Sequence, residues 1–325
     1  MKKKLIAMIL FTTMLFWVTA CAKQGTSQEA AISQASQNTE TKDVSDLRLA
    51  CTLMSLDNPY FIAVMNGFND RCKELGIECQ VTDGKYDASV QISIMENFIA
   101  SGYDGICLSA VDGEGIASIV QQAQQKGIVV IGQAQAVTVA DGNFIVHEYD
   151  YGAMVGAAAA KWINEKLDGE AEVLLITEDN VDKIKLRGDG IEDKIMEMSP
   201  NAKIVSRQAG VEPESAMKIA ESALAANPNI KVIACTNDSA ALGAYEAVKN
   251  IVKDTSDFCI VGADATAEAL AMMQKEGNFF RCTIDIDPYG TGKRCVDMLV
   301  DYIQNGVKNE TVYFEMIPVY QEGWK

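Results

Sequence analysis

The stretch LRLACTLMSLDNPYFIAVMNGFNDRCKEL, residues 47–75, sets the fold of this chain. It opens with a run of apolar residues and continues from Pro59 in a pattern that brings apolar side chains to one face of a helix. Proline is favoured in the first turn of a helix, because that turn has no use for its missing N–H. The stretch therefore predicts a buried strand, a turn at Asn58 and a helix that begins with Tyr60 and Phe61.

Short apolar runs and longer amphipathic stretches alternate along the rest of the chain. Several predicted helices end at a glycine, such as Gly76, Gly102 and Gly127, which closes a helix in the left-handed conformation. Strict alternation is typical of parallel sheets covered by helices on both faces, and about 280 residues usually divide into two lobes. We predict an α/β protein with two doubly wound parallel-sheet (Rossmann-like) lobes. The predicted strands after the first are 77–83, 103–110, 128–133, 143–149, 172–178, 202–208, 231–236, 258–264, 279–285 and 311–319.

The N-terminal residues predict an export signal followed by a tether. Three lysines precede an apolar run that is too short to span a membrane comfortably. The run ends in VTAC, which resembles the lipobox of bacterial lipoproteins and implies that Cys21 is lipidated. An ordinary signal peptide or a core helix with an incidental cysteine is the alternative. The next residues lack aromatics and are rich in Ser, Gln and Thr, so they cannot bury enough surface to fold. We predict a signal peptide at 1–20 and a flexible tether at 21–45.

The net charge of −17 makes nucleic acid an improbable partner, because phosphate backbones would repel the chain. Of the eight cysteines after Cys21, several lie inside apolar runs, where cysteine acts as a small hydrophobic residue. Two pairs, Cys72 with Cys79 and Cys282 with Cys295, would form disulfides only if the geometry allowed it. No CxxC motif or Cys/His cluster is present, so we expect no metal site and no cofactor.

Polar and aromatic residues follow the predicted strands. In open α/β sheets, ligands bind beyond the carboxyl ends of the strands, so these positions are the candidates for a binding site. They are 55–61, Asp83, 109–112, 133–135, 148–150, 178–183, Arg187, Asn237, Asp238, Asp264 and 285–287.

Four motifs in order give the chain a resemblance to a known family. They are DNPYF at 57–61, RGDGI from Arg187, NDSAALGA from Asn237 and VGADATAEAL from Val261. Together they resemble the type I periplasmic binding proteins of ribose and galactose ABC importers, over nearly the whole chain from Leu47. The resemblance implies a soluble receptor, a lipoprotein in Gram-positive bacteria, that closes on a sugar and delivers it to a membrane permease.

The resemblance also implies roles for single residues. Tyr60 and Phe61 would stack on a sugar ring and Asn58 would bind a hydroxyl, although core packing at the helix start is the alternative for the two aromatics. From the second lobe, the matching residues that would grip hydroxyls are Arg187, Asn237 and Asp264. Arg187 has the alternative of a surface pair with Asp189, and the other two have the alternative of capping helices.

The chain departs from the ribose pattern at several positions. Gln133 and Ala134 stand where the ribose receptors carry an Asp-Arg pair, and the aromatic usual near Glu212 is missing. Tyr149 is a candidate replacement for a stacking wall, and Lys183 stands where galactose receptors keep an acidic residue. The surplus of Glu148, Asp264, Asp285 and Asp287 would suit a polyol, an aminosugar or a cation, and Lys183 with Arg187 would suit an acidic group. The predicted ligand-binding set is Asn58, Tyr60, Phe61, Gln133, Tyr149, Lys183, Arg187, Asn237, Asp264 and Asp285.

The family's chain crosses three times between its lobes, which predicts a three-segment hinge here. We predict lobe one at 46–148 plus 286–309 and lobe two at 149–285 plus 310–325. A hinge of this kind lets a ligand bridge the lobes and select the closed state.

An enzyme is the weaker hypothesis. His147 is the single histidine, and the GxxxxGK[ST], HExxH and GxSxG motifs are all absent. A glycoside hydrolase would need a carboxylate pair, for which the aspartates near Asp285 are the candidates. A LacI-type regulator shares the fold, but this chain has an export signal and no helix-turn-helix. We therefore expect a non-enzymatic, monomeric, lipid-anchored extracytoplasmic receptor that serves an ABC permease, with a membrane sensor kinase or chemoreceptor as the alternative partner.

Overall fold

The computed structural model describes residues 42–324 of the chain. The predictions for the signal peptide, for Cys21 and for nearly all of the tether lie outside the described residues. The described part starts with a short 3₁₀ helix, η1 (Val44–Asp46), and the Lys42 ammonium donates to Asp104 Oδ1 at 2.6 Å. The folded part therefore begins a few residues before Asp46. Within residues 42–324, no helix is long and apolar enough to cross a membrane.

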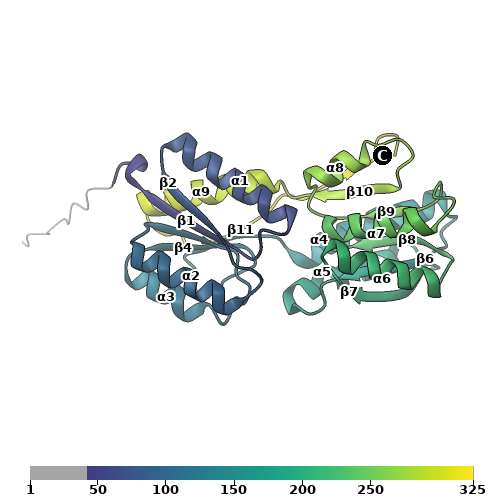
Figure 1. Ribbon diagram of the computed structural model, residues 1–325, viewed down its shortest axis with the longest axis horizontal. Coiled ribbons are helices and arrows are strands. Elements are labelled where there is room, and N and C mark those ends of the chain that lie inside the picture. The colour runs from purple at the N-terminus through teal and green to yellow at the C-terminus, as the bar shows by residue number, and fades with distance from the viewer. Residues whose placement is uncertain (1–41, 325) are drawn as a thin grey trace, which may run out of the picture. The chain divides into compact units, whose positions relative to one another are not determined.

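The first sheet holds six strands, all paired in parallel (Figure 1). In spatial order they are β11 (Thr311–Tyr313), β5 (Gly142–Ile145), β4 (Val129–Ala134), β3 (Gly105–Leu108), β1 (Arg48–Leu53) and β2 (Glu78–Asp83). The helices of this lobe are α1 (Pro59–Leu75), α2 (Ala88–Ser101), α3 (Ala117–Gln125) and α9 (Pro288–Asn305). α1 packs so closely on α9 that a Cβ at Gly67 would lie 1.9 Å from the Tyr289 carbonyl oxygen.

The second sheet also holds six strands. In spatial order they are β12 (Ile317–Tyr320), β10 (Phe280–Asp285), β9 (Cys259–Val261), β8 (Ile230–Cys235), β6 (Glu172–Thr177) and β7 (Lys203–Ala209), and only β12 is antiparallel to its neighbour. Its helices are α4 (Glu148–Lys166), α5 (Asp182–Met198), α6 (Pro213–Ala226), α7 (Asp238–Ile251) and α8 (Ala267–Met273). α4 and α5 pack so closely that a Cβ at Gly152 would lie 1.8 Å from the Arg187 carbonyl oxygen.

The predicted fold class is confirmed, and one lobe boundary needs correction. The prediction placed residues 310–325 in lobe two, but β11 pairs with β5 and so belongs to the first sheet. Phe314, directly after β11, packs on Phe144 with ring centroids 4.4 Å apart. The physical reason is main-chain pairing, because β5 would otherwise leave an unpaired edge that β11 fills. Only β12, beyond Phe314, pairs with the second sheet.

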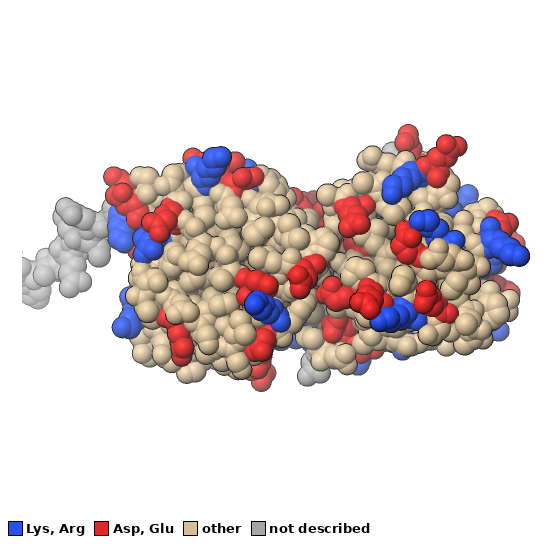
Figure 2. Space-filling model, in the orientation of Figure 1, with Lys and Arg blue, Asp and Glu red and all other residues tan. Residues whose placement is uncertain are grey.

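The eight described cysteines are free thiols, seven of them buried. A thiol hydrogen bond with Cys79, together with burial, raises the pKa of Cys72. These two cysteines therefore lie close together in the first lobe. Cys282 lies on β10 and Cys295 on α9, so the second candidate pair is split between the two lobes. Acidic side chains are spread over the face drawn in Figure 2, with basic ones scattered among them.

Candidate functional site

A cavity of about 410 Å³ lies where the carboxyl ends of strands from both sheets meet. Its walls combine many apolar side chains with a few polar and charged ones, which is the usual composition of a small-molecule site. Six of the ten predicted ligand-binding residues line it. They are Asn58, Tyr60, Phe61, Arg187, Asn237 and Asp264.

The start of α1 forms one wall of the cavity. Asn58 caps the helix, with its Oδ1 accepting the Tyr60 main-chain N–H at 2.9 Å, and Pro59 occupies the first helical position. Tyr60 and Phe61 are each 6% exposed and meet edge to face with centroids 5.0 Å apart. Both rings pack in the core, as the alternative predicts, and both also line the cavity, so stacking on a sugar ring stays a prediction.

Gln133 supports this wall from behind and does not line the cavity. Its Nε2 donates to the Tyr60 hydroxyl oxygen at 2.7 Å, and the side chain is fully buried. Burial raises the pKa of Tyr60 well above its usual range, so the phenol stays neutral. Gln133 therefore fixes the orientation of the tyrosine ring.

Arg187 lies at the second wall, but most of its donors are already engaged. Its Nε donates to Glu148 Oε2 at 2.7 Å, its Nη1 donates to the Thr236 carbonyl at 2.8 Å, and Nη2 also lies 2.7 Å from Glu148 Oε2. The guanidinium carbon sits 4.5 Å from the centre of the Tyr151 ring. The alternative pairing with Asp189 is not formed, because Asp189 is held by Lys185 and Arg207.

Asn237 and Asp264 complete the second wall. Asn237 caps α7, accepting the Ala240 N–H at 2.8 Å, and faces the cavity as well. Asp264 is 5% exposed and accepts the Tyr151 hydroxyl at 2.9 Å, whereas Thr266, not Asp264, caps α8. Burial raises the pKa of Asp264 to about 7. Asp264 also has a φ of 109°, which a non-glycine residue adopts only under strain, and such strain often gathers at functional sites.

Three other predicted residues lie outside the cavity lining, which corrects their placement. Tyr149 is 39% exposed on α4 and donates to Asp193 on α5 at 3.0 Å. The Lys183 ammonium donates to the Ala136 carbonyl at 3.1 Å. Asp285 accepts the Asp287 main-chain N–H at 2.6 Å. In each case the side chain forms a hydrogen bond with a nearby polar group outside the cavity lining.

Sequence reasoning missed several residues that line the cavity. Glu178 lies at the end of a predicted strand but is not in the predicted ligand-binding set. Glu212 is not in that set either, and it marks only the region where the family's usual aromatic residue is missing. Tyr86 lies in the loop between β2 and α2 with a positive φ of 51°. The positions directly after the strands pointed to Glu178. No local signal pointed to Tyr86, because the loop conformation alone brings it to the cavity.

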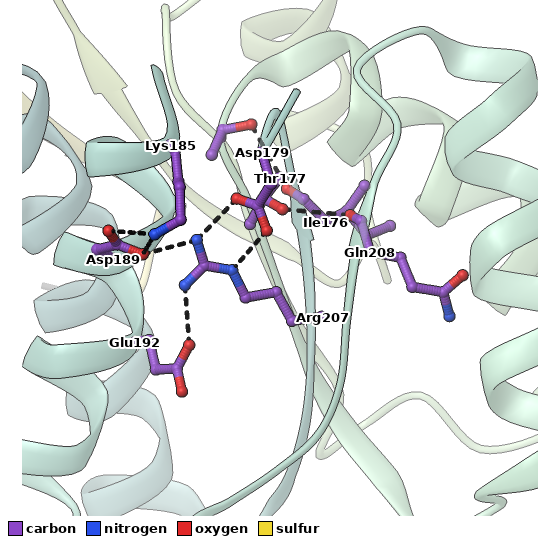
Figure 3. Close-up of polar contacts among 9 residues, drawn as sticks. Ile176, Thr177, Asp179, Lys185, Asp189, Glu192, Arg207 and Gln208 are labelled. Carbon is purple, nitrogen blue, oxygen red and sulfur yellow. Dashed lines mark hydrogen bonds and ion pairs between the residues drawn. The ribbon is translucent and has the colours of Figure 1, made fainter. Parts of the chain in front are cut away.

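Arg207 on β7 anchors α5 beside the second wall (Figure 3). It donates to both carboxylate oxygens of Asp179 at 2.7 and 2.9 Å and to Glu192 at 2.9 Å, and it lies 2.8 Å from Asp189. A Cβ at Gly188 would lie 2.8 Å from its Nη2, so the glycine of RGDGI leaves room for the guanidinium. This cluster fixes the helix that carries Arg187.

Replacing Arg207 by methionine is expected to lower the free energy of unfolding by about 1–3 kcal/mol, because it leaves three carboxylates together without their shared donor. Urea denaturation measures the change. Arg207 holds the pKa of Asp179 below 3.8, so the stabilisation is present above that pH and fades as the pH falls further. Lys185→Met, at the more exposed end of the cluster, is the control, with an expected change within about 0.5 kcal/mol. Equal losses in the two variants would contradict the prediction.

The described residues contain no group of three or more His, Cys, Asp or Glu side chains placed to hold a metal ion.

Comparisons with known proteins agree with this architecture. The family model described as "Periplasmic binding protein domain" matches residues 49–307. The D-allose-binding periplasmic protein of Escherichia coli is 27% identical over 79% of this chain and 85% of its own length. The ribose import binding protein of Bacillus subtilis is 23% identical over 95% of this chain and 96% of its own length.

Solved structures show the same fold. An ABC transporter periplasmic solute binding protein from Actinobacillus succinogenes with bound D-allose superposes with a TM-score of 0.77 at 24% identity, covering 85% of this chain and 98% of that one. The Caulobacter myo-inositol binding protein gives a TM-score of 0.75 at 23% identity, covering 84% and 93%. Because the family model spans most of the chain, this chain belongs to the periplasmic binding protein domain family.

Proposed function

We propose that this protein binds one small sugar-like molecule in the cavity between its lobes and presents it to the permease of an ABC importer. The observation that carries the proposal is the cavity itself, lined by Asn58, Tyr60 and Phe61 from one lobe and by Asn237 and Asp264 from the other. Aromatic rings and planar polar groups together match a ring that has hydroxyls at its rim.

Two contacts between the lobes fit a mechanism of closure on the ligand. Lys183 of α5 bonds to the Ala136 carbonyl of lobe one, and Gln135 donates to Glu148 at 2.9 Å. A ligand that touches both lobes stabilises the closed arrangement, and a membrane partner reads the difference. The same closure would serve a sensor kinase or chemoreceptor, and loss of solute uptake on deletion of the neighbouring permease genes would identify the importer.

We propose binding without catalysis. The aspartates near Asp285, which are the candidates for a hydrolase, lie outside the cavity lining, and each has another role. Asp285 accepts a main-chain N–H, and Asp287 caps α9 and pairs with Arg294 at 2.9 Å. Chromatography of a bound disaccharide after long incubation should recover it intact.

Replacing Asn58 by serine is expected to weaken sugar binding about tenfold while leaving the helix cap in place, because serine also caps but lacks the amide donors. Titration calorimetry of the full chain in a mild detergent, against a panel of monosaccharides, aminosugars, polyols and cyclitols, measures the affinity. Asp87→Ser, which changes the cap of α2 away from the cavity, is the matched control and should bind normally. If no member of the panel binds to the well-folded chain, the proposed function is wrong.

We also propose that Cys21 carries a lipid anchor that holds the receptor at the outer face of the cell membrane. The support is the sequence alone, namely three lysines, an apolar run and VTAC before the tether. Mass spectrometry of protein from native membranes should find an acylated N-terminal Cys21. A mature chain that retains an unmodified Cys21 inside a longer N-terminus would contradict the anchor.

A further inference from the structure

The cavity has more negative than positive charge available to a ligand. Arg187 is the only basic residue among those that line it, and its charge is paired with Glu148, whose side chain is 9% exposed. Glu178, Glu212 and Asp264 also line the cavity, and no described basic side chain forms an ion pair with Glu178 or Glu212. The Arg187 charge is thus paired with Glu148 and acts on Glu178 only at a distance, and neither glutamate has an ion-pair partner among the described residues.

Glu178, Glu212 and Tyr86 form an acidic corner in the cavity. All three residues line the same cavity, and Glu212 raises the pKa of Glu178 while both glutamates raise the pKa of Tyr86, in each case after the larger effect of burial. Burial, followed by the nearby Asp57, raises the pKa of Glu212. Glu178 and Glu212 are half-buried and Tyr86 is 46% exposed, so the corner is shielded from water only in part.

The acidic corner also has unused hydrogen-bond acceptors. Glu212 Oε1 is buried and accepts no hydrogen bond from any described residue, and a buried polar atom without a partner is uncommon in folded proteins. The side-chain oxygens of Asn58 and Asn237 already accept main-chain N–H groups at helix caps. A ligand group that donates hydrogen bonds and brings positive charge is the natural partner, because an ammonium donates three bonds and accepts none.

A neutral sugar would supply no positive charge to the Glu178 and Glu212 carboxylates. When the lobes close on a ligand, the two glutamates lose further water, and burying a carboxylate without a compensating charge is costly. A cation beside the tyrosine ring and the two carboxylates removes that cost, and the ring face adds its own attraction for positive charge.

We propose that the acidic corner binds a positively charged amino group, so that the ligand is an aminosugar or an aminocyclitol and not a neutral sugar. This inference rests on the proposed function, because it names the ligand class of the same cavity. The apolar walls and the Asn58 and Asn237 amides would hold the ring of such a molecule, and the corner would hold its ammonium.

Matched ligand pairs test the inference. Titration calorimetry of the full chain at neutral pH compares D-glucosamine with D-glucose, D-galactosamine with D-galactose, and scyllo-inosamine with scyllo-inositol. We expect the amino member of at least one pair to bind at least about tenfold more tightly than its neutral partner. N-acetyl-D-glucosamine, which keeps the nitrogen and loses the charge, should bind as weakly as the neutral sugar.

The possible results separate the two proposals. If neutral members bind as tightly as their amino partners, the inference is overturned and sugar binding stands. If no member of any pair binds, the proposed function falls and the inference falls with it.

Variants locate the effect in the acidic corner. Glu212→Gln is expected to reduce the preference for the amino member about tenfold while changing the affinity for the neutral member much less. Glu178→Gln is the second variant, should Glu212→Gln melt early. Glu214→Gln is the matched control, because Glu214 is 78% exposed on the same segment and pairs with Lys218. An unchanged preference in folded Glu212→Gln and Glu178→Gln proteins would overturn the proposal.

Discussion

Replacing Arg187 by methionine is expected to lower the free energy of unfolding by about 3–5 kcal/mol, because it leaves the Glu148 carboxylate buried without its partner. The side chains of Arg187 and Glu148 are 12% and 9% exposed, and the guanidinium also holds the Thr236 carbonyl and lies over the Tyr151 ring. Urea denaturation followed by circular dichroism measures the loss, and titration calorimetry should show that binding is lost as well.

The double variant Glu148→Gln, Arg187→Met provides the control for this prediction. It removes both charges, so the Glu148 position no longer carries a buried carboxylate without its partner, and most of the stability should return. The coupling between the two positions is then the difference between the double variant and the sum of the single ones. A single Arg187→Met variant as stable as the unmodified protein would show that the pair carries no such energy.

Asp264→Asn is expected to make the unliganded protein more stable and to abolish ligand binding. Burial raises the pKa of Asp264 from 3.8 to about 7, which means that its charge is disfavoured in the folded state. A shift of about three pH units corresponds to at most ~4 kcal/mol, so we expect a gain of about 1–4 kcal/mol. Functional sites often contain buried charged groups that destabilise the folded state. Replacing such a group therefore raises stability and lowers activity.

The stability gain from Asp264→Asn is expected to depend on pH. Between 3.8 and about 7 the folded protein binds more protons at Asp264 than the unfolded chain does, so the stability of the unmodified protein falls as the pH rises through this window. The gain from Asp264→Asn should therefore be full above pH 7 and vanish below 3.8. Asp257→Asn, at a surface ion pair with Lys231, should change little at any pH. A gain that does not depend on pH would contradict the account.

Most of the fold was predictable from local patterns. The apolar run before Asn58, the proline after it and the amphipathic helix that follows predict β1, a cap and α1, and the structure has all three. These features are local, because strand and helix periodicity and cap preferences depend on neighbours along the chain. Asn237 and Asp264 follow their strands, at the edge where a parallel sheet binds ligands, and the family resemblance implied their roles and that of Arg187.

Pairing between distant segments was not predictable in the same way. Residues 311–313 read as the beginning of one final strand, but they pair with β5 in the first sheet, and only β12 joins the second. Tyr149 and Tyr86 show the same limit for the site, because the former donates to Asp193 on the outside while a loop with positive φ turns the latter into the cavity.

Local patterns along the chain account for the alternating strands and helices and for the polar residues at the strand ends, and four motifs carry the family resemblance. Which charges remain available to a ligand depends on the three-dimensional arrangement of the folded chain. Arg187 matches the expected position, but Glu148 neutralises it, while Glu178 and Glu212 remain without basic partners among the described residues. Charge pairing depends on distances between atoms far apart in the chain and on their burial, and neither quantity is written in a local pattern.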